Sequence, residues 1–319
     1  MTGVAPLTGI RVVELSDDVG LAFCGKYLAA LGAEVTVAAP RSFGGALRDY
    51  LDHGKHTAAA DTAAVEEADV VLLGRASAPG PRPARQIRVL SSDLGENGPR
   101  SDWQGTELTL QAAGGLLAVV GENDREPLQL GGHQVAYSLG TLAFTGVMTA
   151  LAERDRSGEG QDVTLSGLET VAYLEWKGRV YQQAGSPLSR GDRSGPIVLR
   201  CADGHFGFYY RAQDWPHILE VFPDERLRAP EFATHPDRIA HGVLFKEALE
   251  SVVGSLTKDE LYARLQSVGV PAGPVCTPQD LITSPQYQAR GLMVEGPGGQ
   301  GVMPAVAVEF NGRRPQPAA

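Results

Sequence analysis

Short apolar runs separated by polar connections dominate the first third of the chain. Four of these runs have the length and β-branched character of strands, and a helical repeat of apolar positions follows the first one and ends at Gly32. The strand-like runs span residues 10–15, 33–39, 68–74 and 87–93, and the helical repeat spans residues 22–32. Strands that alternate with crossover segments pair in parallel. The pattern therefore predicts an α/β fold with a Rossmann-like parallel sheet.

The pattern changes in the middle of the chain. From Thr106 to Arg154 the sequence is rich in Ala, Gly, Leu and Thr, with small residues wherever two helices would approach closely. We expect buried helices packed against each other there. Residues 161–165 then form another short strand, and a helix begins near Ser166, whose hydroxyl can cap it.

A second region follows the loop at 185–196, which is dense in Gly, Ser, Pro and Arg and has the composition of a linker. Residues 197–210 predict a β-hairpin with its turn at Asp203 and Gly204. Three helical stretches and a late strand come after it, at about 214–222, 236–254, 257–268 and 302–310. This region predicts a smaller α+β domain.

Composition and charge exclude several classes of protein. The 319 residues include 28 Lys and Arg against 38 Asp and Glu, for a net charge of −10, which disfavours a nucleic-acid partner. No run approaches the ~18 apolar residues of a membrane helix, so we expect no membrane partner. The first residues have no basic export signal, and the three cysteines stand far apart. These features predict a cytoplasmic protein.

Isolated motifs leave the chemistry open. None of the seven histidines lies in a metal-binding array, so we expect no metal. The chain has no GxSxG elbow, Walker loop or GxGxxG fingerprint, and the turn after the first strand carries two carboxylates, Asp17 and Asp18, that would repel a pyrophosphate. We therefore expect no nicotinamide or flavin cofactor.

Longer blocks are more informative than these motifs. Nearly the whole chain resembles family III CoA-transferases, the CaiB/BaiF group, which includes formyl-CoA transferase, carnitine CoA-transferases and α-methylacyl-CoA racemase. The resemblance is carried, in order, by PLTGIRVVELS, CGKYLAALGAEVTVAAP, HGKHTAAAD, ADVVLLGRASAPG, SSDLGENGP, GTELTLQAAGGLLAVVG, GVMTALAERDRSGEGQDVTLSGLE, ADGHFGF, VGVPAGPV and SPQYQARGLMVE.

The resemblance implies an architecture and a ligand. It implies a large domain over residues 1–190 that resumes over 290–319, a small domain over 197–289, and a homodimer of two interlocked chains. The implied substrate is coenzyme A as an acyl-CoA thioester. By position, the residues implied in CoA binding are Asp18, Val19, Gly20, Arg41, Gly74 and Arg75.

The catalytic positions depart from the family. Its transferases use an aspartate as nucleophile, and the ungapped match places Ala136 there; a gapped match places His133 there instead. The position of the racemase histidine holds Thr106, and Glu107 adjoins it. The residues predicted to act in catalysis are Glu107, His133, Tyr137 and Asp17.

The leading prediction is a family III CoA-transferase-like enzyme that acts on an acyl-CoA or related thioester. An alternative is acid–base chemistry by an isomerase, racemase, dehydratase or cyclase on an acyl substrate in a biosynthetic pathway. A non-catalytic homologue is the third possibility.

Overall fold

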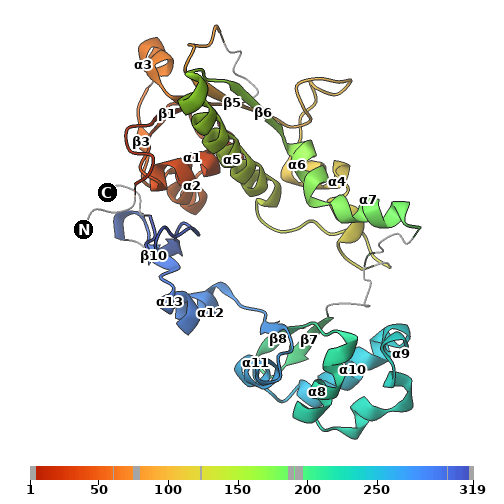
Figure 1. Cartoon of the computed structure of the whole chain (residues 1–319). Helices are drawn as coiled ribbons and strands as arrows, with labels where there is room; N and C mark the ends of the chain where they lie inside the picture. The colour runs from red at the N-terminus through yellow and green to blue at the C-terminus, as the bar shows by residue number, and fades with distance from the viewer. Residues whose placement is uncertain are drawn as a thin grey trace. The chain divides into compact units, whose positions relative to one another are not determined.

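The structure is a computed structural model that describes residues 5–59, 61–74, 80–122, 124–185, 190, 197–299 and 301–315. The chain forms two compact units, one made of Met1–Arg190 with Pro285–Ala319 and the other of Gly191–Ser284. Figure 1 shows the chain coloured from its N-terminus to its C-terminus.

The first unit contains a sheet of six parallel strands in the order β3-β2-β1-β4-β5-β6. This confirms the predicted α/β class, and the predicted strands before residue 170 are all present. The strands are β1 (Arg11–Glu14), β2 (Glu34–Val37), β3 (His56–Thr57), β4 (Val70–Leu73), β5 (Ile87–Ser92) and β6 (Asp162–Ser166). The two-residue strand β3 has no counterpart in the sequence prediction, because it is too short to produce a pattern.

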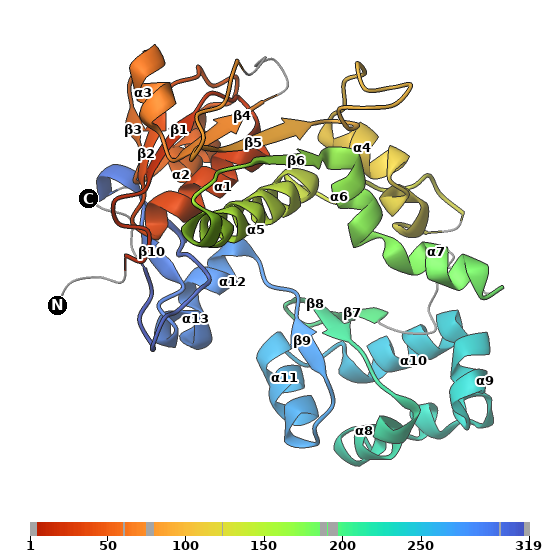
Figure 2. The same cartoon turned by 45° about the horizontal axis from the view of Figure 1, so that its top comes forward.

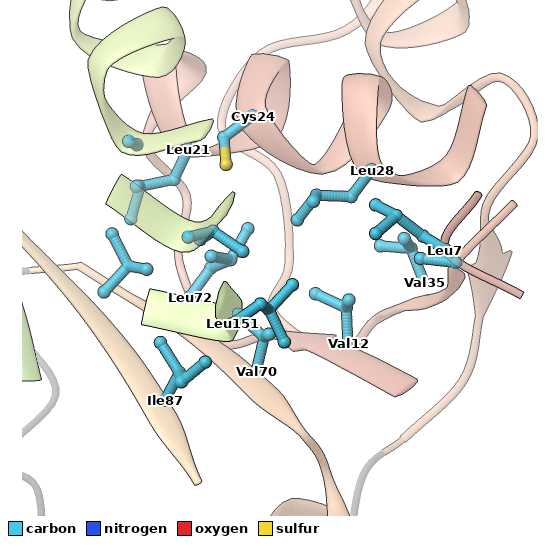
Figure 3. Close-up of a cluster of buried hydrophobic side chains, with 14 of the residues drawn as sticks. Leu7, Val12, Leu21, Cys24, Leu28, Val35, Val70, Leu72, Ile87 and Leu151 are labelled. Carbon is cyan, nitrogen blue, oxygen red and sulfur yellow. The ribbon is translucent and has the colours of Figure 1, made fainter. Parts of the chain in front are cut away.

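Helices α1 and α5 cover one face of this sheet and enclose the main core (Figure 3). The helices and turns of this part are α1 (Val19–Ala30), α2 (Gly45–Asp52), α3 (Thr62–Glu67), α4 (Glu107–Ala113), η1 (Leu116–Val119), α5 (Gln134–Ser157), α6 (Gly167–Leu174) and α7 (Trp176–Gln183). Ser166 caps α6 by accepting a hydrogen bond from the Glu169 amide, as the sequence predicts. Within the described residues, α5 alone has the length and apolar composition of a membrane span. Its buried side chains, including Leu139 and Val147, belong to the core shared with α1.

The two core helices touch backbone to backbone near their N-termini, where Figures 1 and 2 show them side by side. A Cβ atom on Gly140 of α5 would lie 2.3 Å from the carbonyl oxygen of Gly20 in α1, and one on Gly20 would lie 2.6 Å from the carbonyl oxygen of Ala136. Only glycine fits at these two positions. The contact therefore fixes the distance between the start of α1 and the start of α5.

The end of the first unit is a small hairpin rather than a long strand. Helix α13 (Pro285–Ala289), β10 (Met293–Glu295), η5 (Pro297–Gly299) and β11 (Val302–Pro304) follow each other, and β10 pairs antiparallel with β11. The predicted strand over 302–310 is therefore wrong in length. It stops at Pro304, because the partner β10 offers three residues for pairing.

The second unit is an antiparallel sheet of β7 (Ile197–Cys201), β8 (Gly204–Phe208) and β9 (Ala272–Pro274) with helices around it. The hairpin prediction is confirmed, and Gly204 has a φ of 146° at the turn. The helices and turns are η2 (Ala212–Asp214), α8 (Trp215–Val221), η3 (Glu225–Arg228), η4 (Pro230–Phe232), α9 (His235–Ala240), α10 (Gly242–Val253), α11 (Lys258–Ser267) and α12 (Pro278–Thr283). The helix predicted over 236–254 is two helices, with His241 between them.

Candidate active site

A cavity of about 240 Å³ lies in the first unit, where the N-termini of α1, α4 and α5 meet the end of β5. Parallel strands direct the loops after them to one edge of the sheet, which is where α/β proteins bind ligands. The cavity is lined by Asp18, Val19, Ser92, Asp93, Gly105, Thr106, Glu107, Leu110, His133, Val135, Ala136, Leu139 and Gly167. It thus brings together Asp18, Glu107 and His133, which are far apart in the sequence.

Asp18 is held in place by hydrogen bonds from backbone and hydroxyl groups. It is the N-cap of α1, and its Oδ1 accepts from the Gly20 amide at 2.6 Å and from the Leu21 amide at 3.0 Å. Its Oδ2 accepts from the Ser91 hydroxyl at 3.0 Å. Capping of this kind satisfies the free N–H groups of a helix start and places a negative charge at the positive end of its dipole.

Glu107 also caps the start of a helix, but that helix is α5, to which it does not belong. It is the first residue of α4, yet its Oε1 accepts from the Val135 amide at 2.7 Å, and its Oε2 accepts from the Ala136 amide at 3.4 Å. Helix α5 has no cap from the side chain of its own N-cap residue, His133. The side chain of Glu107 supplies that cap from α4. Its carboxylate therefore reaches the backbone of the position where the resemblance expects the nucleophilic aspartate.

The other predicted catalytic residues are placed differently. His133 is half-buried and lines the cavity. The ring of Tyr137 lies 5.9 Å from the ring of His133 and packs against Phe23, outside the lining, and burial raises the pKa of its hydroxyl. Asp17 is exposed and also outside the lining, with its Oδ1 accepting from the Ser42 amide at 2.6 Å.

The residues predicted to bind CoA lie in different environments. Val19 lines the cavity, whereas Gly20 is buried beneath α5. Gly74 follows β4 and faces Ser16, whose hydroxyl oxygen would lie 2.6 Å from a Cβ atom there. Arg75 lies outside the described residues.

Arg41 belongs to a buried group of four charged side chains, which we call the ion cluster: Glu14, Arg41, Asp52 and Lys55. Arg41 pairs with Glu14 and, at 2.9 Å, with Asp52, while the Lys55 ammonium pairs with Glu14 at 2.7 Å. The side chains of Glu14, Arg41 and Lys55 are at most 1% exposed. Arg41 also donates to the Ser16 carbonyl oxygen at 2.7 Å, and thus supports the loop that carries Asp18. In this structure its guanidinium faces inward.

Two further groups near the ion cluster have shifted pKa values. Burial, with a contribution from the nearby Lys55 charge, lowers the pKa of Lys26 to about 8. Its ammonium donates to the Tyr50 carbonyl oxygen at 2.8 Å and lies over the Tyr50 ring. Burial raises the pKa of the Cys24 thiol well above its usual range, which disfavours a reactive thiolate.

The sequence prediction missed Asp93, which lines the cavity and accepts a hydrogen bond from the Gly105 amide at 2.9 Å. The signal was present, because Asp93 is the last residue of the strand predicted over 87–93, and the carboxyl end of a parallel strand should border the site. Within the described ranges, no group of three or more His, Cys, Asp or Glu side chains is arranged to hold a metal ion.

The fold and this cavity are those of an α/β enzyme with its polar groups at the carboxyl edge of a parallel sheet. The sequence pattern of CoA-transferase family III matches residues 85–318. The chain therefore belongs to CoA-transferase family III and is an enzyme of that family, with a CoA-transferase-like function on acyl-CoA substrates.

Individual relatives agree with this assignment. The chain is 27% identical to a succinate–glutarate CoA-transferase of Agrobacterium fabrum, over 91% of this chain and 85% of that protein. It is 30% identical to the α-methylacyl-CoA racemase of Mus musculus, over 63% of this chain and 60% of that protein. Among solved structures, a CaiB/BaiF family protein from Brucella suis superposes with a TM-score of 0.85 at 25% identity, over 98% of this chain and 94% of that one.

Proposed function

We propose that the cavity binds the acyl end of an acyl-CoA and that Glu107 is the nucleophile of a CoA transfer. One observation carries this proposal: the Glu107 carboxylate reaches the amide of Ala136, the position at which the ungapped match to the family expects the aspartate of its transferases. A glutamate on another helix would normally be misplaced by more than the ~1 Å that such chemistry tolerates. Here its hydrogen bonds hold the carboxylate against the backbone amides at the start of α5, which supports a role beside that position.

The proposed reaction follows from carboxylate chemistry. Glu107 Oε2 attacks the thioester carbonyl, the C–S bond breaks, and CoA leaves as a thiolate with formation of an acyl–glutamyl anhydride. The thiolate then attacks the glutamyl carbonyl, which releases the first acid as a carboxylate and leaves Glu107 as its CoA thioester. The acceptor carboxylate attacks this thioester, and the returning thiolate attacks the acyl carbonyl of the new anhydride. These steps yield the new acyl-CoA and restore Glu107.

Acid–base chemistry at the α-carbon of the acyl group is the second candidate. It is favoured by the presence of His133 in the same cavity as Glu107, since a carboxylate and an imidazole can exchange a proton with a carbon between them. The chain's similarity to a racemase is consistent with it.

Trapping experiments separate the two candidates. Hydroxylamine or borohydride treatment in the presence of an acyl-CoA should modify Glu107 and leave Ala136 unmodified, as read by peptide mass spectrometry. Glu107→Gln should lower the transfer rate at least ~100-fold, since it removes the attacking oxygen. Glu66→Gln, an exposed glutamate on α3, is the matched control and should retain the rate.

Two other outcomes would contradict the proposed transfer reaction. If no adduct forms, and Glu107→Gln and His133→Ala each abolish solvent-deuterium exchange into bound substrate, acid–base chemistry replaces transfer. Full activity in both variants would contradict this assignment of the site.

We propose further that the CoA moiety extends from the cavity past Asp18, Val19 and Gly20 toward Gly74 and Arg75. This part of the proposal rests on the family resemblance. The Arg41 side chain is not included as a phosphate ligand, because it is buried and its two terminal nitrogens donate to the ion cluster and to the Ser16 carbonyl oxygen. Its proposed role is to hold the loop before α1.

Finally, we propose a cytoplasmic homodimer. Large apolar side chains remain exposed on α6 and α7, among them Tyr173 at 72% and Trp176 at 56% exposure, and such patches are typical of subunit interfaces. Light scattering should therefore give twice the chain mass of 33.8 kDa at micromolar concentration. A monomeric mass would contradict the dimer.

A further inference from the structure

The charges of the residues that line the cavity indicate which acyl groups it can accept. Three of its lining residues are the carboxylates Asp18, Asp93 and Glu107, and among the described lining residues none is lysine or arginine. The imidazole of His133 is the one basic side chain in that lining, so the lining has a negative formal charge in either protonation state of His133.

The hydrogen bonds of Asp18 and Glu107 show how these charges are held. Asp18 accepts hydrogen bonds from two backbone amides and a serine hydroxyl, and Glu107 accepts from two backbone amides and the side-chain amide of Gln111. These donors are uncharged. Peptide dipoles stabilise a carboxylate but do not cancel its charge, so the negative potential extends into the cavity.

We infer that this enzyme selects acyl groups that carry no second carboxylate. The inference rests on the function proposed above, because it assumes that the acyl chain enters this cavity. A dicarboxylic half-thioester such as succinyl-CoA would place its free carboxylate among Asp18, Asp93 and Glu107. Like charges in a partly enclosed site repel each other more strongly than they do in water. A chain that ends in a methyl group instead contacts Val19, Leu110 and Leu139.

This selectivity would distinguish the protein from relatives named for succinate, glutarate and oxalate. The cavity volume is about 240 Å³, only several times the volume of about 30 Å³ that one water molecule takes up in the liquid. A cavity of this size suits a short acyl chain. The favoured substrate class is a short, uncharged acyl thioester.

The test uses two pairs of thioesters that differ only at the chain end: butyryl-CoA with succinyl-CoA, and valeryl-CoA with glutaryl-CoA. Calorimetric titration of the full chain should show at least ten-fold tighter binding of the uncharged member in each pair. Equal binding, or tighter binding of the dicarboxylic member, would overturn the inference and leave the proposed function intact. Absence of binding for all four would overturn both.

A charge-neutral variant tests the cause of the preference. Asp18→Asn retains the geometry of the cap, because the amide oxygen can accept from Gly20 and Leu21 and the amide nitrogen can donate to Ser91. It should reduce the butyryl-to-succinyl binding ratio at least three-fold. Asp49→Asn, which neutralises an exposed carboxylate on α2 outside the lining, is the control and should leave the ratio within two-fold. An unchanged ratio in Asp18→Asn would overturn the inference, because the lining charge would then not set the preference.

Discussion

The ion cluster and the cavity are two groups of charged side chains in the same unit, and they are stabilised in different ways. In the ion cluster, Glu14 is neutralised by Arg41 and Lys55, with both partners buried. In the cavity, Asp18 and Glu107 are held by the N–H groups of helix starts. A buried charge that is neutralised by an opposite charge interacts only weakly with a ligand. A charge that is stabilised only by dipoles is not neutralised and can still interact with a ligand.

The largest effect should come from breaking the ion cluster. Glu14→Gln leaves two buried cations without their main partner, and removing one member of a buried ion pair costs about 3–5 kcal/mol of unfolding free energy. Urea unfolding of the variant against wild type measures this loss.

An exposed pair provides the control. Arg11 and Glu67 pair at 3.0 Å with side chains 53% and 66% exposed. Glu67→Gln should cost about 1 kcal/mol or less, since solvent screens such pairs. Equal losses in Glu14→Gln and Glu67→Gln would show that the ion cluster contributes no more than a surface pair, and the contrast with the cavity would fail.

A smaller loss is expected when the helix starts that form the cavity are pushed apart. In Gly140→Ala the new methyl group would lie 2.3 Å from the Gly20 carbonyl oxygen. Overpacking of this kind costs about 1–3 kcal/mol. Because the start of α1 carries Asp18 and the start of α5 carries Ala136, acyl-CoA affinity should fall as well, by calorimetry. Gly131→Ala has no atom within 4 Å of the new methyl and should change stability by less than about 0.5 kcal/mol.

The smallest effect concerns Lys26, a buried cation beside the ion cluster that bonds to a backbone carbonyl rather than to a carboxylate. Its pKa is about 8 in the folded chain, below the ~10.4 of an unfolded lysine. Between these values the unfolded state binds more protons, so the stability contribution of Lys26 rises with pH.

A comparison of wild type with Lys26→Met isolates this contribution. The difference in unfolding free energy should shift in favour of wild type by about 1.5 kcal/mol between pH 8 and 9.5. Urea unfolding at several pH values measures the shift. A difference that stays constant over this range would mean that the burial of Lys26 does not disfavour its charged form.

The contrast between these two regions also explains what the sequence could predict. The parallel sheet and the hairpin at Gly204 follow from local periodicity and turn chemistry, which are visible in short windows. Glu107 was predicted because it lies within a block that resembles a family, and Asp18 because it lies between two such blocks. The ion cluster was missed, because Glu14 reads as part of an apolar strand and its partners lie up to 41 residues away.

The pairing of Glu107 with the start of α5 could not be predicted either. A helix-start glutamate is expected to stabilise its own helix, whereas this one caps a helix that begins 27 residues later. Only the packing of α4 against α5 reveals which amides its oxygens reach. By contrast, the failed strand over 302–310 shows that a short apolar pattern does not fix strand length without its partner.

The cap that α4 provides to α5 has a consequence for redesign of the enzyme. Introducing the aspartate of the family's transferases by Ala136→Asp alone would place a second carboxylate beside Glu107, so that two negative charges compete for the same amides. Pairing Ala136→Asp with Glu107→Ala would instead leave one carboxylate at the start of α5 and free its amides for the new side chain.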